Sequence, residues 1–297
     1  MKPKRPSMTL PASLRPPALS GCRRFLVLST FFSFSLALLP NPADATGSLP
    51  GFDNETASSY PGQNQEMDAR QVFEELDRRR STAGYETAKM TMVIHSSRGR
   101  TRTRELRTWS VNRDDVTKQL VFFESPADVR NTGLLTINEG GTESQTIYLP
   151  AVGRAQTIGS SQRSDRFMGS DFTYEDLGQQ NPELFEFEII SQNDETILLE
   201  AVPRHESQYE KIHFHIRQEN YVLAKAEYFN SSGTISRRLE LASHEILEDG
   251  SWRPGHMVMF DLENDTKTEL TWEERTINEP VPDVFFTERQ LRRGIPR

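Results

Sequence analysis

Apolar and polar residues alternate along most of the chain after residue 84. Met90, Met92 and Ile94 occupy every second position of one run. This period of two is typical of β-strands with one buried face. Further runs of strand character follow at residues 104–111, 118–125, 133–137, 145–150, 184–191, 195–202, 211–218, 221–229, 236–247, 256–263 and 266–277. Short polar turns separate most of them, and turns this short connect antiparallel neighbours. The pattern predicts a long up-and-down antiparallel meander.

Two segments break this pattern and predict helices. Val72, Phe73 and Leu76 lie at helical spacing within residues 68–80, where Asp68 is placed to cap an amphipathic helix. Near the other end, Asp283 is placed to cap a short helix that buries Phe286 and Leu291. So few helices cannot cover a flat sheet of this size. We therefore expect a mainly β (α+β) fold, with the strongly curved meander forming an incomplete, half-open β-barrel.

The beginning of the sequence has the features of an export signal. Basic residues precede an uncharged, largely apolar stretch, Phe25–Leu39, which is shorter than the roughly 20 residues that span a bilayer. Ala43-Asp44-Ala45 then offers a small-x-small cleavage site. We expect a cleavable signal peptide (1–45) with cleavage after Ala45, a flexible linker (46–66), one folded domain (67–297) and a periplasmic location.

Charge and cysteine content narrow the functional classes. The formal net charge is −8, and loss of the basic signal peptide would make the mature chain more acidic. An acidic surface disfavours nucleic-acid binding. Cys22 is the only cysteine and lies within the expected signal peptide, so we expect neither disulfides nor thiolate metal sites. Cys22 precedes the apolar stretch, which argues against lipidation.

The sequence does not suggest an enzyme. It contains no G-x-S-x-G, H-E-x-x-H or phosphate-binding glycine loop. His213 and His215 lie on the same face of an expected strand, but no third ligand has useful spacing, so we predict neither a metal nor a cofactor. A secreted hydrolase would need a nucleophile or acid–base group that the sequence does not nominate.

Two segments resemble a known family. Tyr148-Leu149-Pro150-Ala151, Arg154 and the run SDRFMGSDFTYEDL from Ser164 to Leu177 are similar to the hallmark of outer-membrane lipoprotein-sorting proteins, a branch of the periplasmic lipoprotein-carrier (LolA/LolB-like) family. The ending from Pro282 to Arg293 is similar as well. The resemblance covers roughly residues 68–293. The chain departs from the classical carriers in its 150–178 insertion and its long linker, and no segment matches a carrier's docking residues.

The resemblance implies a half-open barrel whose apolar cavity lies under a helical lid. It also implies a monomeric carrier that binds lipoproteins or lipids, contacts membranes transiently and works with a resistance-nodulation-division (RND) type exporter. A second possibility is an envelope sensor or adaptor that uses the same fold to bind a protein partner. Because one fold serves many functions, the resemblance supports the fold more strongly than it supports the identity of the cargo.

A carrier of this kind needs an apolar cavity. Exposing an acyl chain to water costs about 0.8 kcal/mol per methylene, so about 12 kcal/mol for sixteen carbons. Flexible methionine and aromatic side chains adapt well to such a chain. The candidates in the first strands are Met90, Met92, Ile94, Leu106, Leu120, Phe122, Leu134 and Ile147. Alternation alone does not distinguish a cavity lining from ordinary core.

The 150–178 segment is the candidate lid. Its glycines fit hinges, and its aromatic residues and arginines fit a cavity mouth and a polar headgroup. The candidates are Arg154, Arg163, Arg166, Phe167, Met168, Asp171, Phe172 and Tyr174. The alternative is a buried insertion in which Asp165, Asp171 and Asp176 pair with these arginines.

Overall fold

The computed structural model describes residues 67–80, 84–113, 115–179 and 181–296. The expected signal peptide and linker lie outside these residues. Within them, no helix is long and apolar enough to cross a membrane.

The first element is the predicted amphipathic helix, α1 (Ala69–Arg80). Asp68 accepts a hydrogen bond from the Gln71 backbone N–H at 2.8 Å, which satisfies one of the free donors of the first turn. Val72, Phe73 and Leu76 are buried, as the spacing predicts. Their burial fixes the helix against the sheet.

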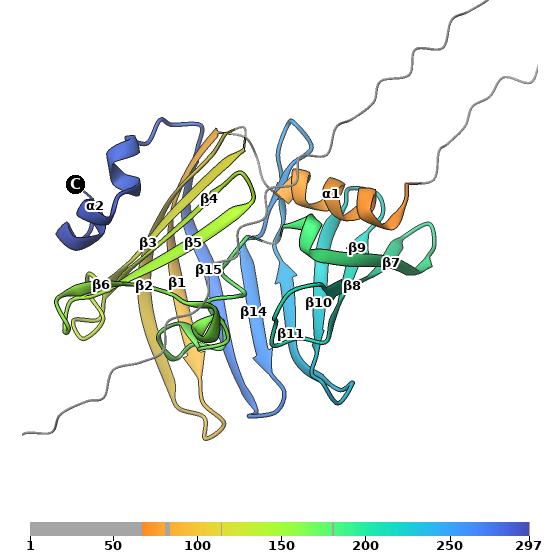
Figure 1. Ribbon diagram of the computed structural model, residues 1–297, viewed down its shortest axis with the longest axis horizontal. Coiled ribbons are helices and arrows are strands. Elements are labelled where there is room, and N and C mark those ends of the chain that lie inside the picture. The colour runs from red at the N-terminus through yellow and green to blue at the C-terminus, as the bar shows by residue number, and fades with distance from the viewer. Residues whose placement is uncertain (1–66, 81–83, 114, 180, 297) are drawn as a thin grey trace, which may run out of the picture. The chain divides into compact units, whose positions relative to one another are not determined.

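The rest of the described chain is dominated by one antiparallel sheet of thirteen strands in the order β6-β5-β4-β3-β2-β1-β15-β14-β11-β10-β9-β8-β7 (Figure 1). Its strands are β1 (Gly84–His95), β2 (Thr101–Arg113), β3 (Val116–Ser125), β4 (Gly133–Glu139), β5 (Thr142–Leu149), β6 (Arg154–Thr157), β7 (Phe185–Gln192), β8 (Thr196–Pro203), β9 (Lys211–Arg217), β10 (Val222–Phe229), β11 (Ile235–Ala242), β14 (His256–Asp261) and β15 (Thr266–Ile277). β6 and β7 are the two edges. The sheet is strongly curved and not closed, which confirms the predicted fold class.

The sheet is not one uninterrupted meander. β1 pairs with β15 from Glu86 to His95, for example Met90 with Trp272 and Met92 with Leu270. This long-range pairing joins two meanders, β1–β6 and β7–β15, into one surface. The break falls between β6 and β7, which the chain connects through residues 158–184 rather than through a tight turn.

Short elements complete the fold. A small hairpin, β12 (Glu245–Ile246) and β13 (Trp252–Arg253), stands apart from the main sheet. Three 3-10 turns follow β6: η1 (Ser160–Gln162), η2 (Phe167–Gly169) and η3 (Pro182–Leu184). The chain ends with η4 (Asp283–Phe286) and α2 (Glu288–Arg293).

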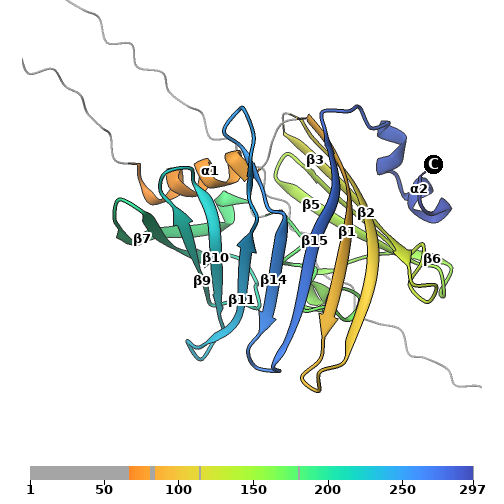
Figure 2. The same ribbon diagram turned by 180° about the vertical axis from the view of Figure 1, so that it is seen from behind.

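The two faces of the sheet bury different clusters. The inner face, which carries Met90 and Leu106, packs against α1 and the segment after β6. In Figure 1 that segment lies in front of β1, β15 and β14, and in Figure 2 those strands lie in front of it. The outer face of β2–β4 carries a second cluster that includes Trp109 and Leu120 and is covered by the C-terminal elements. Both faces of β2–β4 are therefore covered.

The C-terminal helix buries the predicted residues but is capped differently. Phe286 and Leu291 are buried in the outer cluster. Thr287, rather than Asp283, caps α2, and its hydroxyl accepts a hydrogen bond from the Gln290 backbone N–H at 3.2 Å. Asp283 belongs to the preceding 3-10 turn. The helix starts later than predicted because residues 283–286 form that separate turn.

Candidate functional site

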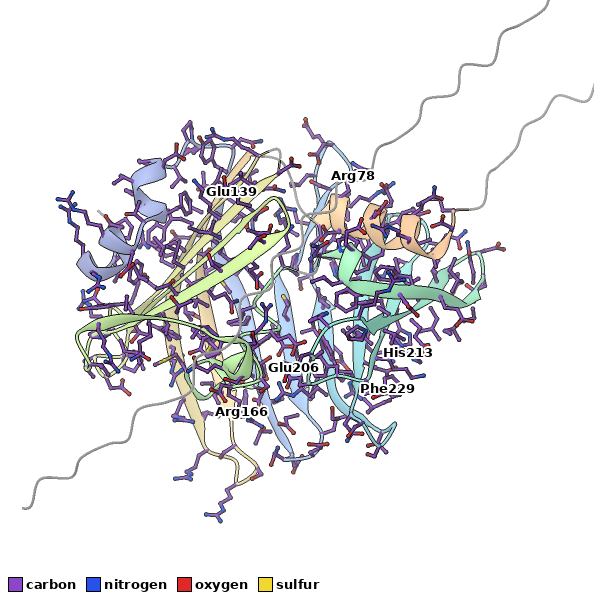
Figure 3. The ribbon with its side chains drawn as sticks, in the orientation of Figure 1. Arg78, Glu139, Arg166, Glu206, His213 and Phe229 are labelled. Carbon is purple, nitrogen blue, oxygen red and sulfur yellow. The ribbon has the colours of Figure 1, made fainter. Side chains whose placement is uncertain are left out.

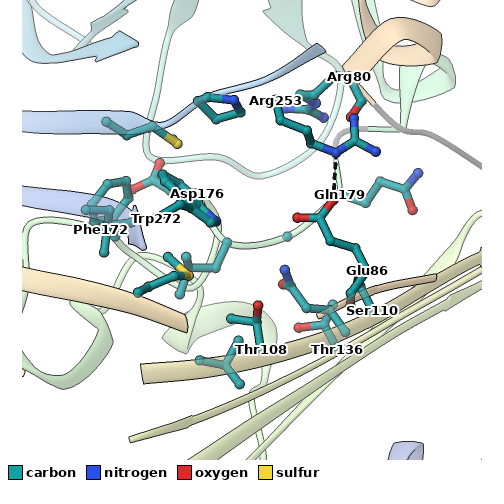
Figure 4. A pocket seen from close by; sticks show the side chains of 18 of the residues that line it. Arg80, Glu86, Thr108, Ser110, Thr136, Phe172, Asp176, Gln179, Arg253 and Trp272 are labelled. Carbon is teal, nitrogen blue, oxygen red and sulfur yellow. Dashed lines mark hydrogen bonds and ion pairs between the residues drawn. The ribbon is translucent and has the colours of Figure 1, made fainter. Parts of the chain in front are cut away.

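The inner face contains a cavity of about 400 Å³ (Figure 4), within the range of about 300–1,000 Å³ that is typical of ligand sites. It runs between the two meanders, across β1–β4 on one side and β10, β11, β14 and β15 on the other. The 150–178 segment contributes Phe167 and Phe172 to its wall. The cavity therefore depends on the β1–β15 pairing, which brings the two halves together.

Most of the wall is apolar, with several methionine and aromatic side chains. Its main apolar residues are Met90, Met92, Leu106, Val121, Leu134, Phe167, Phe172, Phe214, Leu223, Tyr228, Leu239, Leu241, Trp252, Met257, Met259, Leu270 and Trp272. Such a surface holds a flexible apolar ligand through burial rather than through fixed contacts.

The structure divides the predicted cavity residues into three groups. Met90, Met92, Leu106 and Leu134 line the cavity. Ile94 and Ile147 belong to the same inner cluster but are packed away from the cavity wall.

Leu120 and Phe122 lie instead on the outer face. On β3 the cavity is lined by their neighbour Val121. The two faces of this strand are both buried, so its apolar alternation did not reveal which face is the inner one.

A group of charged residues lies at one end of the cavity. Glu86 accepts hydrogen bonds from Arg253 at 2.6 Å and from Arg275 at 3.1 Å (Figure 4 shows the first). Arg253 also donates to the Arg80 carbonyl oxygen at 2.6 Å, which ties the end of α1 to the β12–β13 hairpin. Burial lowers the pKa of Arg275, and the nearby Glu86 carboxylate opposes this effect. The Glu245 carboxylate also lies 3.8 Å from Arg275, so two carboxylates balance the two guanidinium groups.

The 150–178 segment is fastened to the opposite end of the inner face by buried polar contacts. Arg104 on β2 donates to the Met168 carbonyl oxygen at 2.7 Å, and Arg237 on β11 donates to the Asp171 carbonyl oxygen at 2.9 Å. Thr268 on β15 donates to the Asp171 carboxylate at 2.7 Å. Contacts to three strands make the segment a bridge between the two meanders.

The arginines that were expected to meet a headgroup are placed differently. Arg163 pairs with Glu143 at 2.8 Å. Arg166 pairs with Asp171 at 2.7 Å and also with Asp261. Both guanidinium groups therefore face carboxylates of the protein instead of the cavity. The Arg166–Asp171 pair is one that the alternative of a buried insertion expects. Arg154, at the start of the edge strand β6, is exposed.

The acidic residue at the end of this segment is also held internally. Asp176 accepts a hydrogen bond from the Tyr209 hydroxyl at 2.7 Å and lies 3.5 Å from Arg237. Burial raises the pKa of Asp176, and the hydrogen bonds from Thr173 and Tyr209 oppose this effect. Its contacts join the segment to β11 and to the loop before β9.

The aromatic residues of the segment pack as a group. The Phe167 ring stacks on Phe123 of β3 with centroids 5.5 Å apart, and Tyr174 meets the Phe167 ring edge-on at 5.8 Å. Tyr174 is buried beside the cavity without lining it, and Met168 packs partly buried against the inner cluster.

Several lining residues were missed because they belong to the second meander. Leu239, Met257 and Met259 follow the same period of two as the chosen residues. That signal was present in the sequence. The missing information was the pairing of β1 with β15, which turns these strands toward Met90.

The histidines of β9 have ordinary partners on the outer face. His213 lies 2.8 Å from Glu200, and His215 lies 2.9 Å from Glu227. Figure 3 shows His213 far from Arg166, on the other half of the sheet. No group of three potential metal ligands occurs among the residues with described positions.

Comparisons with known proteins identify the fold and the family. A family model described only as "Uncharacterized protein" matches residues 115–293. No curated protein sequence matches the chain. A domain from Vibrio parahaemolyticus, described as an outer membrane lipoprotein-sorting protein, has a TM-score of 0.71 and 27% identity, covering 75% of this chain and 98% of its own.

Two more distant structures share the fold. A DUF1329 family protein from Desulfovibrio piger has a TM-score of 0.69 and 20% identity, covering 75% of this chain and 99% of its own. A LolA superfamily protein from Nitrosomonas europaea has a TM-score of 0.60 and 19% identity, with the same coverage of both chains. The chain belongs to the family that this model describes, and it has the LolA-like fold of these structures.

Proposed function

We propose that the protein is a non-enzymatic periplasmic carrier that encloses the acyl chains of lipoproteins or lipids and moves them toward the outer membrane. The observation that carries this proposal is the methionine- and aromatic-rich cavity beneath the 150–178 segment. Enclosing a sixteen-carbon chain would offset about 12 kcal/mol of exposure to water. The similarity to a lipoprotein-sorting domain supports the same role.

The cavity suits binding better than catalysis. Its charged residues Glu86, Arg253 and Arg275 are already paired with one another. The Asp176 carboxylate accepts hydrogen bonds from Thr173 and Tyr209. Such groups stabilise the wall, whereas a catalytic acid or base must reach a substrate.

The 150–178 segment is the proposed lid of the carrier. Because polar contacts hold it to β2, β11 and β15, cargo entry would need these contacts to open together. An RND-type exporter in the inner membrane is the proposed partner that supplies or receives the cargo.

The lipid bound to the protein in the cell envelope tests this proposal. The full chain is expressed with its own leader, purified from the periplasm without detergent and analysed for extractable lipid by mass spectrometry. We expect acyl lipid or acylated protein at close to one equivalent. Crosslinking to one stable protein partner, with no lipid in the cavity, would favour the sensor or adaptor role instead.

A further inference from the structure

The inner face of the first meander changes from apolar to polar along its strands. The register places Thr108, Val121, Leu134 and Ile147 in one cross-strand row. The next row toward the Glu86 end consists of Glu86, Ser110, Gln119, Thr136 and Gln145. The row after that contains Asn112, Thr117, Asn138 and Glu143. One end of the cavity is therefore apolar and the other is polar.

Several of these polar side chains lie in the cavity wall without a partner. Thr136 is 7% exposed and Asn138 is 8% exposed, and both line the cavity. Neither side chain, nor that of Gln119 or Thr108 beside them, hydrogen-bonds to another residue in the described part of the chain. Their polar groups are accessible from the cavity, so a ligand that places hydrogen-bonding groups there can pair with them.

The free groups are all uncharged. The charged groups at this end pair with one another. Glu86 accepts hydrogen bonds from Arg253 and Arg275, and Arg275 also lies 3.8 Å from the Glu245 carboxylate and donates to the Pro254 carbonyl oxygen at 2.9 Å. An anionic headgroup would have to replace the Glu86 carboxylate in these pairs. The hydroxyl and amide groups, in contrast, can donate to ester and amide oxygens and accept from hydroxyls.

We propose that the cargo lies lengthwise in the cavity, with its acyl chains against Met90 and Leu134 and a neutral, hydrogen-bonding headgroup against Gln119, Thr136 and Asn138. The protein then selects lipids whose polar part consists of hydroxyl, ester or amide groups over lipids that carry a phosphate. This selectivity rests on the proposed binding of acyl chains and specifies its ligand class.

The test compares two ligands with the same acyl chain. Monopalmitoylglycerol and palmitoyl lysophosphatidic acid, which differ by the phosphate, compete with a fluorescent fatty-acid probe on the delipidated full-length mature chain. We expect monopalmitoylglycerol to bind about tenfold more tightly, in line with one or two net hydrogen bonds.

The double variant Thr136→Val, Asn138→Leu removes two of the hydrogen-bonding groups that we expect to cause this preference. It should weaken monopalmitoylglycerol about tenfold and palmitoyl lysophosphatidic acid much less. Thr142→Val makes the same Thr-to-Val exchange at an exposed position of the neighbouring strand β5 and should change nothing. Thermal unfolding verifies that each variant is folded.

Equal affinity for the two ligands in the wild type would overturn this inference, and so would equal weakening of both ligands in the double variant. In either case, retained probe binding would leave the carrier proposal intact. Failure of the wild type to bind the probe would overturn both.

Discussion

Thr268 on the central strand β15 donates a hydrogen bond to the carboxylate of Asp171 at 2.7 Å, and the Asp171 backbone N–H donates to the same hydroxyl at 2.9 Å. Thr268 is fully buried and Asp171 is 1% exposed. The two residues are 97 positions apart in the sequence. Their reciprocal contact fixes the FMGSDF portion of the 150–178 segment to the middle of the sheet.

Thr268→Val should loosen this segment. The exchange preserves the shape of the side chain but leaves the Asp171 carboxylate and backbone N–H without one partner, at a cost of about 1–3 kcal/mol. Hydrogen exchange of residues 164–177 should accelerate more than exchange in β9. Thr271→Val, at an exposed position of the same strand, is the control. Unchanged protection in Thr268→Val would show that other contacts hold the segment.

Gly133→Ala should displace the C-terminal helix. A Cβ at Gly133 would lie 2.4 Å from Phe122 Cε1 and 2.8 Å from Leu291 Cδ1, closer than packed carbon atoms approach. Overpacking of this kind costs about 1–3 kcal/mol. We expect a lower thermal midpoint and faster proteolysis within α2.

Gly159→Ala is the matched control for that variant. Its Cβ would meet no atom closer than 3.8 Å, and the residue lies in an extended conformation. Equal stability of the two alanine variants would contradict the packing that Gly133 indicates.

Glu75 should contribute to stability in a pH-dependent way. Hydrogen bonds from Arg78 and Arg79 lower its pKa from the ordinary 4.5 to about 2. A depressed carboxyl pKa stabilises the folded state fully above the unfolded value, and this contribution is lost as the pH falls from about 4.5 to about 2. The side chain is partly exposed, so the contribution is about 1 kcal/mol or less.

Urea unfolding at two pH values measures this contribution. Wild type should exceed Glu75→Gln in unfolding free energy at pH near 6, and the difference should shrink at pH near 3. Glu74→Gln, on the same helix, is the control, since Glu74 is more exposed than Glu75. A difference that is constant with pH would mean that the two arginines do not hold the Glu75 carboxylate.

The sequence predicted the local elements better than their arrangement. Alternation along β1 places Met90 and Met92 on one face, and that face alone is buried in the structure. On β3 the neighbours Phe122 and Phe123 are both fully buried, one under the C-terminal helix and one under the 150–178 segment. A period of two identifies two faces but does not tell which one borders a cavity.

The contacts of the candidate lid could not be predicted from the sequence for a different reason. The run from Ser164 to Leu177 is rich in charge, which is typical of both a solvated segment and a buried polar network. Arg166 meets Asp261, which lies 95 residues further along the chain. Only the folded sheet brings β14 beside this segment, so the pairing could not be read from spacing.

Titration of a fluorescent fatty-acid probe into delipidated protein measures whether the cavity encloses an acyl chain. Leu270 lines the cavity, whereas Thr271 next to it is exposed. We expect saturable binding by the wild type and by Thr271→Trp, and binding about tenfold weaker by Leu270→Trp, whose larger ring occupies the cavity. Absence of binding by the wild type, or equal binding by both tryptophan variants, would contradict this expectation.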